Sequence, residues 1–248
     1  MMLRDYSFIS VNRDPHTFEM HRLVQLAMRK WLTAHGEEEI WKIHFIWNVH
    51  RECLEKDPNQ LENSQFLFPH IMAAMSQRPA LKQSQLRWTS LLLYGAHYPY
   101  FTGNTPEMLR VEEKASAELG RLLGGDDLQT IRANKALAFA YMVEDRLDDA
   151  EALQLKVLKT SQGSLGERDR IRLEIMENLS WTYQGQGRYQ DAIELQKQGL
   201  EAGQATFGAD DELTIGFMGS LANTYRKQGR LREADPGTFN LLEKQPRH

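Results

Sequence analysis

Apolar positions in the second half of the chain recur with a period of 42 residues. Three Leu–Tyr pairs, each with its members four residues apart, follow this period: Leu137 and Tyr141, Leu179 and Tyr183, Leu221 and Tyr225. Residues four apart lie on the same face of an α-helix, so each pair predicts a helix with one buried side. Nine residues after each Tyr comes an alanine, which predicts a second, closely packed helix: Ala150, Ala192 and Ala234.

The turn between the two helices of each unit follows the same period. Gly187 and Gly229 stand where the first helix should end, and glycine favours the left-handed conformation that closes many helices. Asp145 replaces this glycine in the first copy, and it tolerates that conformation less well. One helix pair cannot bury its apolar side alone, whereas a stack of such pairs can. The predicted fold class is therefore all-α, a right-handed α-solenoid of helix pairs.

The period divides residues 86–244 into four units, of which the first is degenerate. Their predicted bounds are about 86–126, 127–168, 169–210 and 211–244. Gly103 keeps the step of 42 residues to Asp145, but Pro99 stands at the Tyr position of the first unit. Pro236 falls within the second helix of the last unit, where a proline costs about 3 kcal/mol. We expect that helix to be broken or short, and the array to be truncated there or to continue in a different reading frame.

The repeated motif resembles a tetratricopeptide repeat (TPR). The resemblance rests on the Leu-small-x-x-Tyr motif, on the Gly-Arg turn and on the alanine nine residues after the Tyr. The 42-residue period and the loop Leu165-Gly166-Glu167-Arg168-Asp169 are similar to those of the kinesin-light-chain subtype. This resemblance implies a scaffold that binds proteins or peptides in a concave groove lined by the first helices of its units.

The first 35 residues have a different pattern. Residues 6–11 alternate and favour a β-strand, and residues 16–20 can form the returning strand of a hairpin. Helical spacing of apolar residues then continues as far as Trp31. A hairpin with one helix is too small to be a stable domain, so we interpret residues 1–35 as a winged-helix remnant. Residues 36–85 are predicted to be a helical connector between this remnant and the repeats.

The junction Met20-His21-Arg22-Leu23-Val24-Gln25 resembles that of fungal NB-ARC–TPR proteins, which are signalling ATPases of the NLR-like STAND class. In that family a Met-His-Asp motif ends the winged helix, and its His helps to sense a bound phosphate. The resemblance implies a vestigial nucleotide sensor at His21, with Arg22 in place of the Asp. The alternative is that Met20 and Val24 pack the helix while His21 is a polar surface residue. No Gly-x-x-x-x-Gly-Lys-Ser/Thr loop occurs in the sequence, so no nucleotide site is predicted.

Composition and charge limit the classes of partner that this protein could bind. The sequence has 248 residues and a formal net charge of −4, and no basic stripe interleaved with aromatic residues points to nucleic acid. No apolar run approaches the length of a transmembrane span, so we expect no membrane partner. Cys53 is the single cysteine, which excludes an internal disulfide and fits a cytoplasmic protein.

Motifs for catalysis or metal binding are missing from the sequence. The eight histidines include no His-Glu-x-x-His pair, and one cysteine cannot seed a zinc cluster. We interpret Cys53 as a small apolar core residue rather than a reactive thiol. The carboxylate runs at Glu37–Glu39 and Asp148–Asp149 are typical of the first turn of a helix. We therefore expect no enzymatic activity, no catalytic residue, no metal and no cofactor.

Register with the repeated Leu and Tyr indicates which side chains line the groove of the first helices. The predicted peptide-binding residues are Lys135, Phe139, Met142, Glu177, Trp181, Gln184, Asn223, Arg226 and Lys227. Their amides can hydrogen-bond a peptide backbone, and their basic groups attract carboxylates. Trp181 is the candidate for the largest single contribution to binding. Alternatively, Phe139 and Trp181 pack between neighbouring first helices.

Two functions fit these features. The first is a protein–protein interaction scaffold that forms the tail of a fungal NLR-like signalling ATPase and lacks the nucleotide-binding domain. The second is a stand-alone adaptor of the kinesin-light-chain type, which a heptad coiled coil upstream of the repeats would favour, and the sequence holds none. A helical enzyme would be a remote third function. In the first two cases the partner is a protein or a peptide, and the repeats also offer a surface for self-association.

Overall fold

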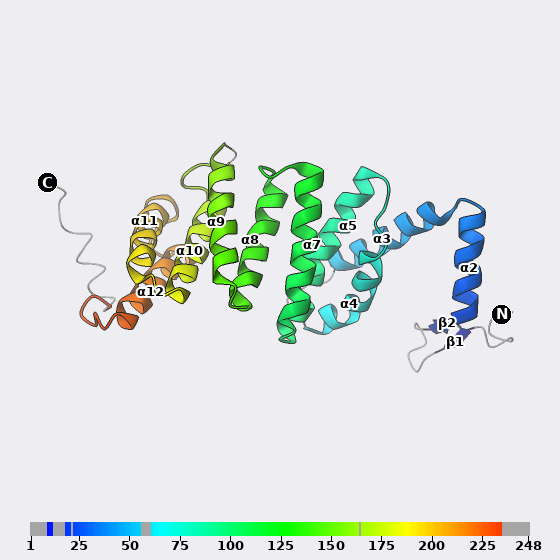
Figure 1. Ribbon diagram of the computed structural model, residues 1–248, viewed down its shortest axis with the longest axis horizontal. Helices are drawn as coiled ribbons and strands as arrows, with labels where there is room; N and C mark the ends of the chain where they lie inside the picture. Colours follow the sequence, from blue (N-terminus) through cyan, green and yellow to red (C-terminus); the bar gives the residue numbers. More distant parts are fainter. Residues whose placement is uncertain (1–8, 12–17, 21, 56–60, 164, 235–248) are drawn as a thin grey trace.

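The computed structural model describes residues 9–11, 18–20, 22–55, 61–163 and 165–234. The helices of this part follow one another along the long axis of the molecule, from α2 at one end to α12 at the other (Figure 1). Their bounds are α2 (Arg22–Ala34), α3 (Glu38–Glu55), α4 (Leu61–Met75), α5 (Lys82–Gly95), α6 (His97–Phe101), α7 (Thr105–Leu123), α8 (Leu128–Val143), α9 (Leu147–Thr160), η1 (Ser161–Gly163), α10 (Arg170–Gly185), α11 (Tyr189–Phe207) and α12 (Glu212–Lys227). Consecutive helices from α7 to α12 pack against one another. The predicted stack of helix pairs is thereby confirmed.

Each first helix of a repeat begins after an aspartate that caps it. Asp127 precedes α8, Asp169 precedes α10 and Asp211 precedes α12. Each carboxylate accepts a hydrogen bond from the backbone N–H two residues later, at 2.8, 2.8 and 3.0 Å respectively. Such caps satisfy N–H groups that have no partner within the helix. The loops of the 42-residue repeat therefore fix where its first helices start.

The turn that ends each first helix has a left-handed residue, as predicted. Gly187 and Gly229 both have a φ of 76°, and Asp145 has a φ of 58° at the same place in the repeat. Asp145 is the one non-glycine residue with positive φ in the described part of the chain. Each next residue is an arginine whose guanidinium lies 4.2 to 4.6 Å from the ring centre of the repeat Tyr: Arg146 on Tyr141, Arg188 on Tyr183 and Arg230 on Tyr225. This contact explains why the Tyr and the arginine recur together.

Buried polar side chains join successive repeats. Gln154 of α9 accepts a hydrogen bond from Thr182 of α10 at 2.9 Å, and Gln196 of α11 accepts one from Thr224 of α12 at 3.0 Å. The amide of Gln196 also donates to Ser180 at 3.2 Å. A buried polar group is costly unless it is paired. These pairs therefore favour one register between neighbouring repeats.

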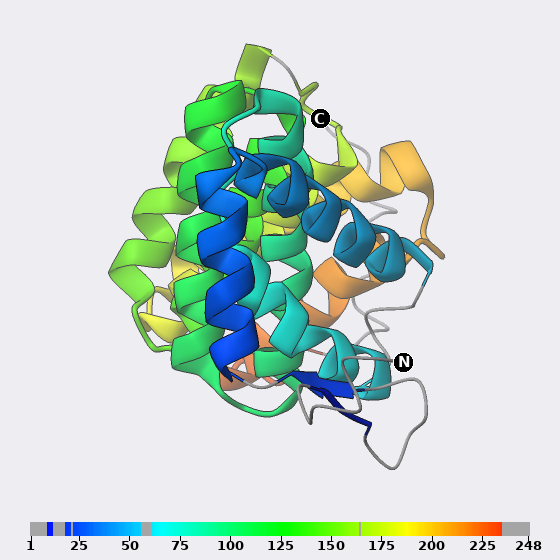
Figure 2. The same cartoon turned by 90° about the vertical axis from the view of Figure 1, so that its right-hand side faces the viewer.

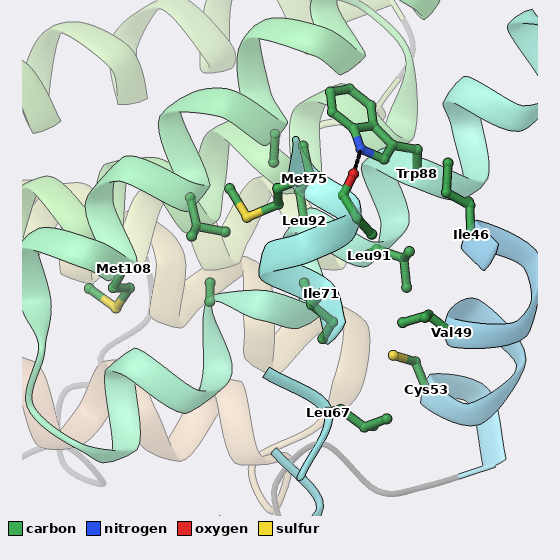
Figure 3. Close-up of a cluster of buried hydrophobic side chains, with 14 of the residues drawn as sticks. Ile46, Val49, Cys53, Leu67, Ile71, Met75, Trp88, Leu91, Leu92 and Met108 are labelled. Carbon is green, nitrogen blue, oxygen red and sulfur yellow. Dashed lines mark hydrogen bonds between the residues drawn. The ribbon is translucent and has the colours of Figure 1, made fainter. Parts of the chain in front are cut away.

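An apolar core lies among α3, α4, α5 and α7. Figure 3 shows side chains from these helices in this core, among them Ile46, Ile71 and Trp88. The indole Nε1 of Trp88 donates to the backbone oxygen of Ala74 at 2.8 Å. Cys53 is buried in the same core, and burial raises the pKa of its thiol to about 12. The interpretation of Cys53 as an apolar core residue is confirmed.

The described part of α2 has no buried side. Strands β1 (Ile9–Val11) and β2 (Phe18–Met20) pair antiparallel, and α2 stands at the end of the molecule, where Figure 2 shows it in front of the other helices. No residue from Leu23 to Ala34 is buried, and Trp31 is among the exposed apolar side chains. A winged-helix unit needs a buried face on its helices. The predicted strand pair and the helix after it are present, but we correct the winged-helix remnant to a strand pair followed by a helix in which no residue from Leu23 to Ala34 is buried.

Some expectations about the two ends of the chain stay predictions. His21 lies outside the described residues, so its interpretation as a nucleotide sensor remains as stated. The break expected at Pro236 also lies outside them. The bounds predicted for the domains and units likewise stay predictions.

Candidate functional site

Side chains predicted to line the groove lie along α8, α10 and α12, the first helices of the repeats. We call the surface that carries Lys135, Trp181 and Asn223 the first-helix face. Contacts across it join residues 39 positions apart: Lys135 pairs with Glu174, Trp181 Nε1 donates to Ser220 Oγ at 2.7 Å, and Asn223 Nδ2 donates to Gln184 Oε1 at 3.3 Å. This constant separation means that equivalent places on successive helices touch. The structure thus brings predicted residues from all three repeats into one row.

A cavity of about 750 Å³ opens between α8 and α10. The ion pair of Lys135 and Glu174 lies in its wall, together with Arg132 and Arg170. Arg170 is held by Asp211 at 3.0 Å. Arg132 makes no ion pair with any residue of the described part of the chain. This end of the first-helix face therefore offers one uncommitted cation beside an apolar surface, which suits a carboxylate or a peptide carbonyl oxygen.

Phe139 lines a second, smaller cavity of about 290 Å³. The rings of Tyr100 and Phe101 from α6 form another part of its wall, and the ring centres of Tyr100 and Phe139 are 6.0 Å apart. Tyr100 and Phe139 are again 39 positions apart, so this aromatic pair extends the row toward the N-terminus. Phe139 therefore packs against a neighbouring helix and also borders a cavity.

Trp181 likewise combines both roles that the sequence left open. Its indole is hydrogen-bonded to Ser220 of the next first helix, yet the residue is 38% exposed. An aromatic residue held in place by one polar contact, with part of its ring free, loses little conformational entropy when a ligand covers it. Trp181 is therefore available to a partner, and its role in binding stays a prediction.

Glu177 occupies the middle of the row beside Gly216 of α12. A Cβ added to Gly216 would lie 2.5 Å from Glu177 Oε1, so the carboxyl occupies the space that a side chain would take. Burial, with smaller contributions from Glu174 and Glu212, raises the pKa of Glu177 to about 7. Near neutral pH this group can act either as a hydrogen-bond donor or as an acceptor.

The remaining predicted residues differ in accessibility. Gln184 is only 6% exposed and accepts its hydrogen bond from Asn223, which in turn accepts one from Arg226. Met142 is half-buried, and its sulfur accepts from Gln154 at 3.5 Å. Arg226 and Lys227 are exposed at the end of α12. The structure therefore gives Gln184 an internal partner and leaves the two basic groups open to solvent.

Glu112 is a site residue that the sequence reasoning missed. It lies in the wall of the cavity that Phe139 lines, is 7% exposed, and its Oε2 has no hydrogen-bond partner among the described residues. The period could have found it, because Glu112 stands 42 positions before Gln154. The repeat position holds an acid here and a buried amide in the next two repeats, and the sequence reasoning did not compare these positions.

We expect the wild-type protein to become less stable as the pH rises. In the Glu112→Gln variant this loss of stability should be absent. Burial raises the pKa of Glu112 from 4.5 to about 8, so between these values the folded protein keeps a proton that the unfolded chain releases. The free energy of unfolding then falls with rising pH, by at most about 1.4 kcal/mol per pH unit. Urea unfolding of both proteins, at about pH 5 and about pH 8, measures the effect. If the difference in unfolding free energy between the wild type and the variant is the same at both pH values, the prediction is wrong.

Among the described residues, no group of three or more His, Cys, Asp and Glu side chains is placed to hold a metal ion. No helix in that part of the chain combines the length and the apolar character needed to cross a bilayer.

Residues 129–205 match the family model of the tetratricopeptide repeat. These residues run from α8 to α11. The helix pairs of this segment, with their 42-residue period, are therefore tetratricopeptide-like repeats. No curated protein sequence matches this chain.

Solved structures show similarity over more of the chain. Nearly identical TPR-like repeats of a Podosopora anserina protein described as a kinesin light chain superpose with a TM-score of 0.65 and 20% identity, covering 80% of this chain and 92% of that one. BtubC (BKLC) from P. vanneervenii gives 0.57 and 14%, covering 86% and 95%. Bacillus thuringiensis PlcR, solved with the peptide PapR7 and DNA, gives 0.51 and 15%, covering 82% and 70%. At such identities the similarity establishes the fold alone. The predicted tetratricopeptide repeat is confirmed for residues 129–205, whereas the kinesin-light-chain subtype and the NB-ARC relationship stay predictions.

Proposed function

We propose that this protein is an interaction scaffold that binds a peptide or a protein segment on its first-helix face, without catalysing a reaction. One observation carries the proposal: a row of partly exposed polar and aromatic side chains crosses three repeats and borders a cavity of about 750 Å³. Ligand cavities commonly occupy about 300–1,000 Å³. The similarity to PlcR, a protein solved with a bound peptide, supports the same class of ligand.

The extended form of a peptide suits this face. Amide groups such as that of Asn223 can pair with a peptide backbone, while Arg132 and Arg226 attract acidic groups. Because successive contacts are spaced evenly along the helices, a segment several residues long could cross more than one repeat. Self-association through the repeats would use the same surface and is an alternative occupant.

The setting of the scaffold is a finer proposal. The segment from Met20 to Gln25 supports a place in the tail of a fungal NLR-like signalling ATPase, because it resembles the junction before the repeats of such proteins. The structural similarity to kinesin-light-chain repeats favours the second candidate, a stand-alone adaptor. Sequencing the genomic region upstream of Met1 separates them. A P-loop domain in the same reading frame supports the first, and a coiled coil supports the second.

We expect Trp181→Ala to weaken peptide binding by about 30-fold, as loss of a dominant contact does. The test begins with selection of peptides from a random displayed library on the full chain. Calorimetry then gives the dissociation constant for the wild type and the variant. Trp47→Ala is the matched control, because Trp47 is 44% exposed on α3, a helix outside the first-helix face.

The control variant should bind as the wild type does, and both variants should keep their helicity and melting temperature. If Trp181→Ala unfolds the protein, Trp181 belongs to the core, and Arg226→Ala then tests the face instead. Arg226 is exposed and contacts Asn223 at 3.2 Å, so its loss should leave the fold intact. Unchanged binding by both Trp181→Ala and Arg226→Ala contradicts the proposal.

A further inference from the structure

Glu112 breaks a pattern that the next two repeats keep. Gln154 and Gln196 stand at the corresponding places, and each accepts a hydrogen bond from a threonine of the following first helix. The corresponding partner of Glu112 would be residue 140, where the chain has alanine instead of threonine. Both members of the pair have therefore changed: the neutral amide is replaced by an acid, and its hydroxyl partner is missing.

The surroundings of Glu112 do not compensate for this loss. The residue is 7% exposed, and its Oε2 is buried without a hydrogen bond in the described part of the chain. An unpaired carboxyl group in such a place is costly in either protonation state, and much more so when it is charged. The structure thus keeps an acid where an amide with a partner would be more stable.

The cavity beside Glu112 has a wall that suits a positive charge. Tyr100, Phe101 and Phe139 contribute aromatic rings, and Met108 contributes an apolar side chain. Aromatic rings attract cations at their faces, and the attraction is stronger away from water. The long aliphatic part of a lysine or an arginine can lie along such rings while its charged end reaches further. The residues that line this cavity include no basic side chain, so an acidic ligand would find no cation there.

We propose that the cavity lined by Glu112 and Phe139 receives a lysine or arginine side chain of a bound peptide, whose cation pairs with the Glu112 carboxylate. The inference rests on the proposed peptide-binding function of the first-helix face, because Phe139 belongs to both. It adds a requirement for one basic residue in the ligand. The cation of the ligand replaces the partner that residue 140 does not supply.

The pairing should strengthen as the pH rises from about 7 to about 9. Burial raises the pKa of Glu112 to about 8, so the empty cavity largely holds a protonated carboxyl near neutral pH, and a bound cation favours release of that proton. Tyr100 is the other titratable side chain in the wall. Binding is therefore best measured near pH 8.5. Amines and guanidines still carry their charge there, because the pKa of a lysine amine is about 10.4.

The test uses small mimics of the two side chains on the full chain. n-Butylammonium and n-propylguanidinium carry the cation, and n-butanol is the neutral control of similar shape. The methyl signal of Met108, labelled with carbon-13, reports binding because this residue lines the cavity. Glu112→Gln is the test variant, since glutamine is the residue that the two following repeats hold at this place. Glu113→Gln is the matched control at a neighbouring, exposed carboxylate.

We expect both cations to shift the Met108 signal in a saturable way, n-butanol to shift it weakly, and Glu112→Gln to reduce cation affinity by about ten-fold or more. Glu113→Gln should bind as the wild type does. Equal binding of n-butanol, or undiminished binding of cations by Glu112→Gln, overturns the inference. Circular dichroism of each variant confirms that it is folded.

Peptides selected on the first-helix face distinguish the two proposals. Replacing the basic residues of a selected peptide with norleucine should weaken binding by about ten-fold or more to the wild type and much less to Glu112→Gln. Peptides that bind equally well without basic residues overturn the inference and leave the proposed function standing. If n-butylammonium binds but no peptide is selected, the proposed function is wrong. The assignment of the cavity to a basic side chain of a bound peptide is then wrong as well.

Discussion

Gly199→Ala is expected to destabilise the protein by about 1–3 kcal/mol, although alanine is the better helix former. Gly199 lies within α11, where it faces Phe217 of α12. A Cβ at this place would lie 2.8 Å from Phe217 Cδ1 and closer still to Cε1 and Cζ. Phe217 is fully buried and cannot turn away without opening the interface between the two helices. Overpacking therefore outweighs the gain in helix propensity.

Gly219→Ala is the matched control for this prediction. Gly219 lies within α12, and a Cβ added there meets nothing within 4 Å. The same substitution should therefore stabilise the protein by about 1 kcal/mol. Urea unfolding followed by circular dichroism gives both values. The packing argument is lost if Gly199→Ala is as stable as Gly219→Ala.

Trp88→Ala is expected to cost about 3–5 kcal/mol, the largest loss among the changes considered. Trp88 is 1% exposed and lies in the apolar core that Figure 3 shows, with its indole N–H bonded to the backbone of Ala74. The Nζ atom of Lys114 in α7 lies 5.1 Å from the centre of the Trp88 ring. Removing the ring would therefore leave a void between α4, α5 and α7. Such a void cannot close without moving three helices.

Trp47→Ala removes the same side chain from an exposed place on α3 and should cost less than about 1 kcal/mol. Arg51 lies 5.0 Å from the Trp47 ring centre, a contact that water weakens. Urea midpoints of both variants, compared with the wild type, measure the contrast. Similar losses for Trp47→Ala and Trp88→Ala would mean that the core shown in Figure 3 does not determine stability.

The repeated positions of the sequence predict the helices from α8 to α12 because the residue at each position acts within its own helix or turn. Leu137 and its counterparts face the core, Gly187 and Gly229 close the first helices, and the alanines of the second helices permit close packing. None of these tasks depends on a distant part of the chain. The first helices of the repeats, and which of their side chains share a face, could therefore be predicted from the period alone.

Features that depend on how helices meet could not be predicted in this way. The pairing of Lys135 with Glu174 follows from the angle at which α8 and α10 pack, which spacing within one helix does not determine. The cavity at Glu112 requires α6 to place Tyr100 and Phe101 opposite α8. The apolar spacing of α2 predicts a buried face, but burial needs a surface that covers it, and Trp31 remains 51% exposed.

The buried glutamine–threonine pairs have a consequence for how such a chain can change its length. Segment 169–210 carries Thr182 in its first helix and Gln196 in its second. Thr182 already pairs with the glutamine of the repeat before it, Gln154, so Gln196 could pair in the same way with the Thr182 of a second copy placed after it. A gene that duplicated the segment 169–210 would therefore create a new junction with the same hydrogen bond. The junction between Glu112 and residue 140 has no such pair. A duplicated unit would therefore keep the glutamine–threonine hydrogen bond at each new junction, whereas the junction at Glu112 offers no such bond to repeat.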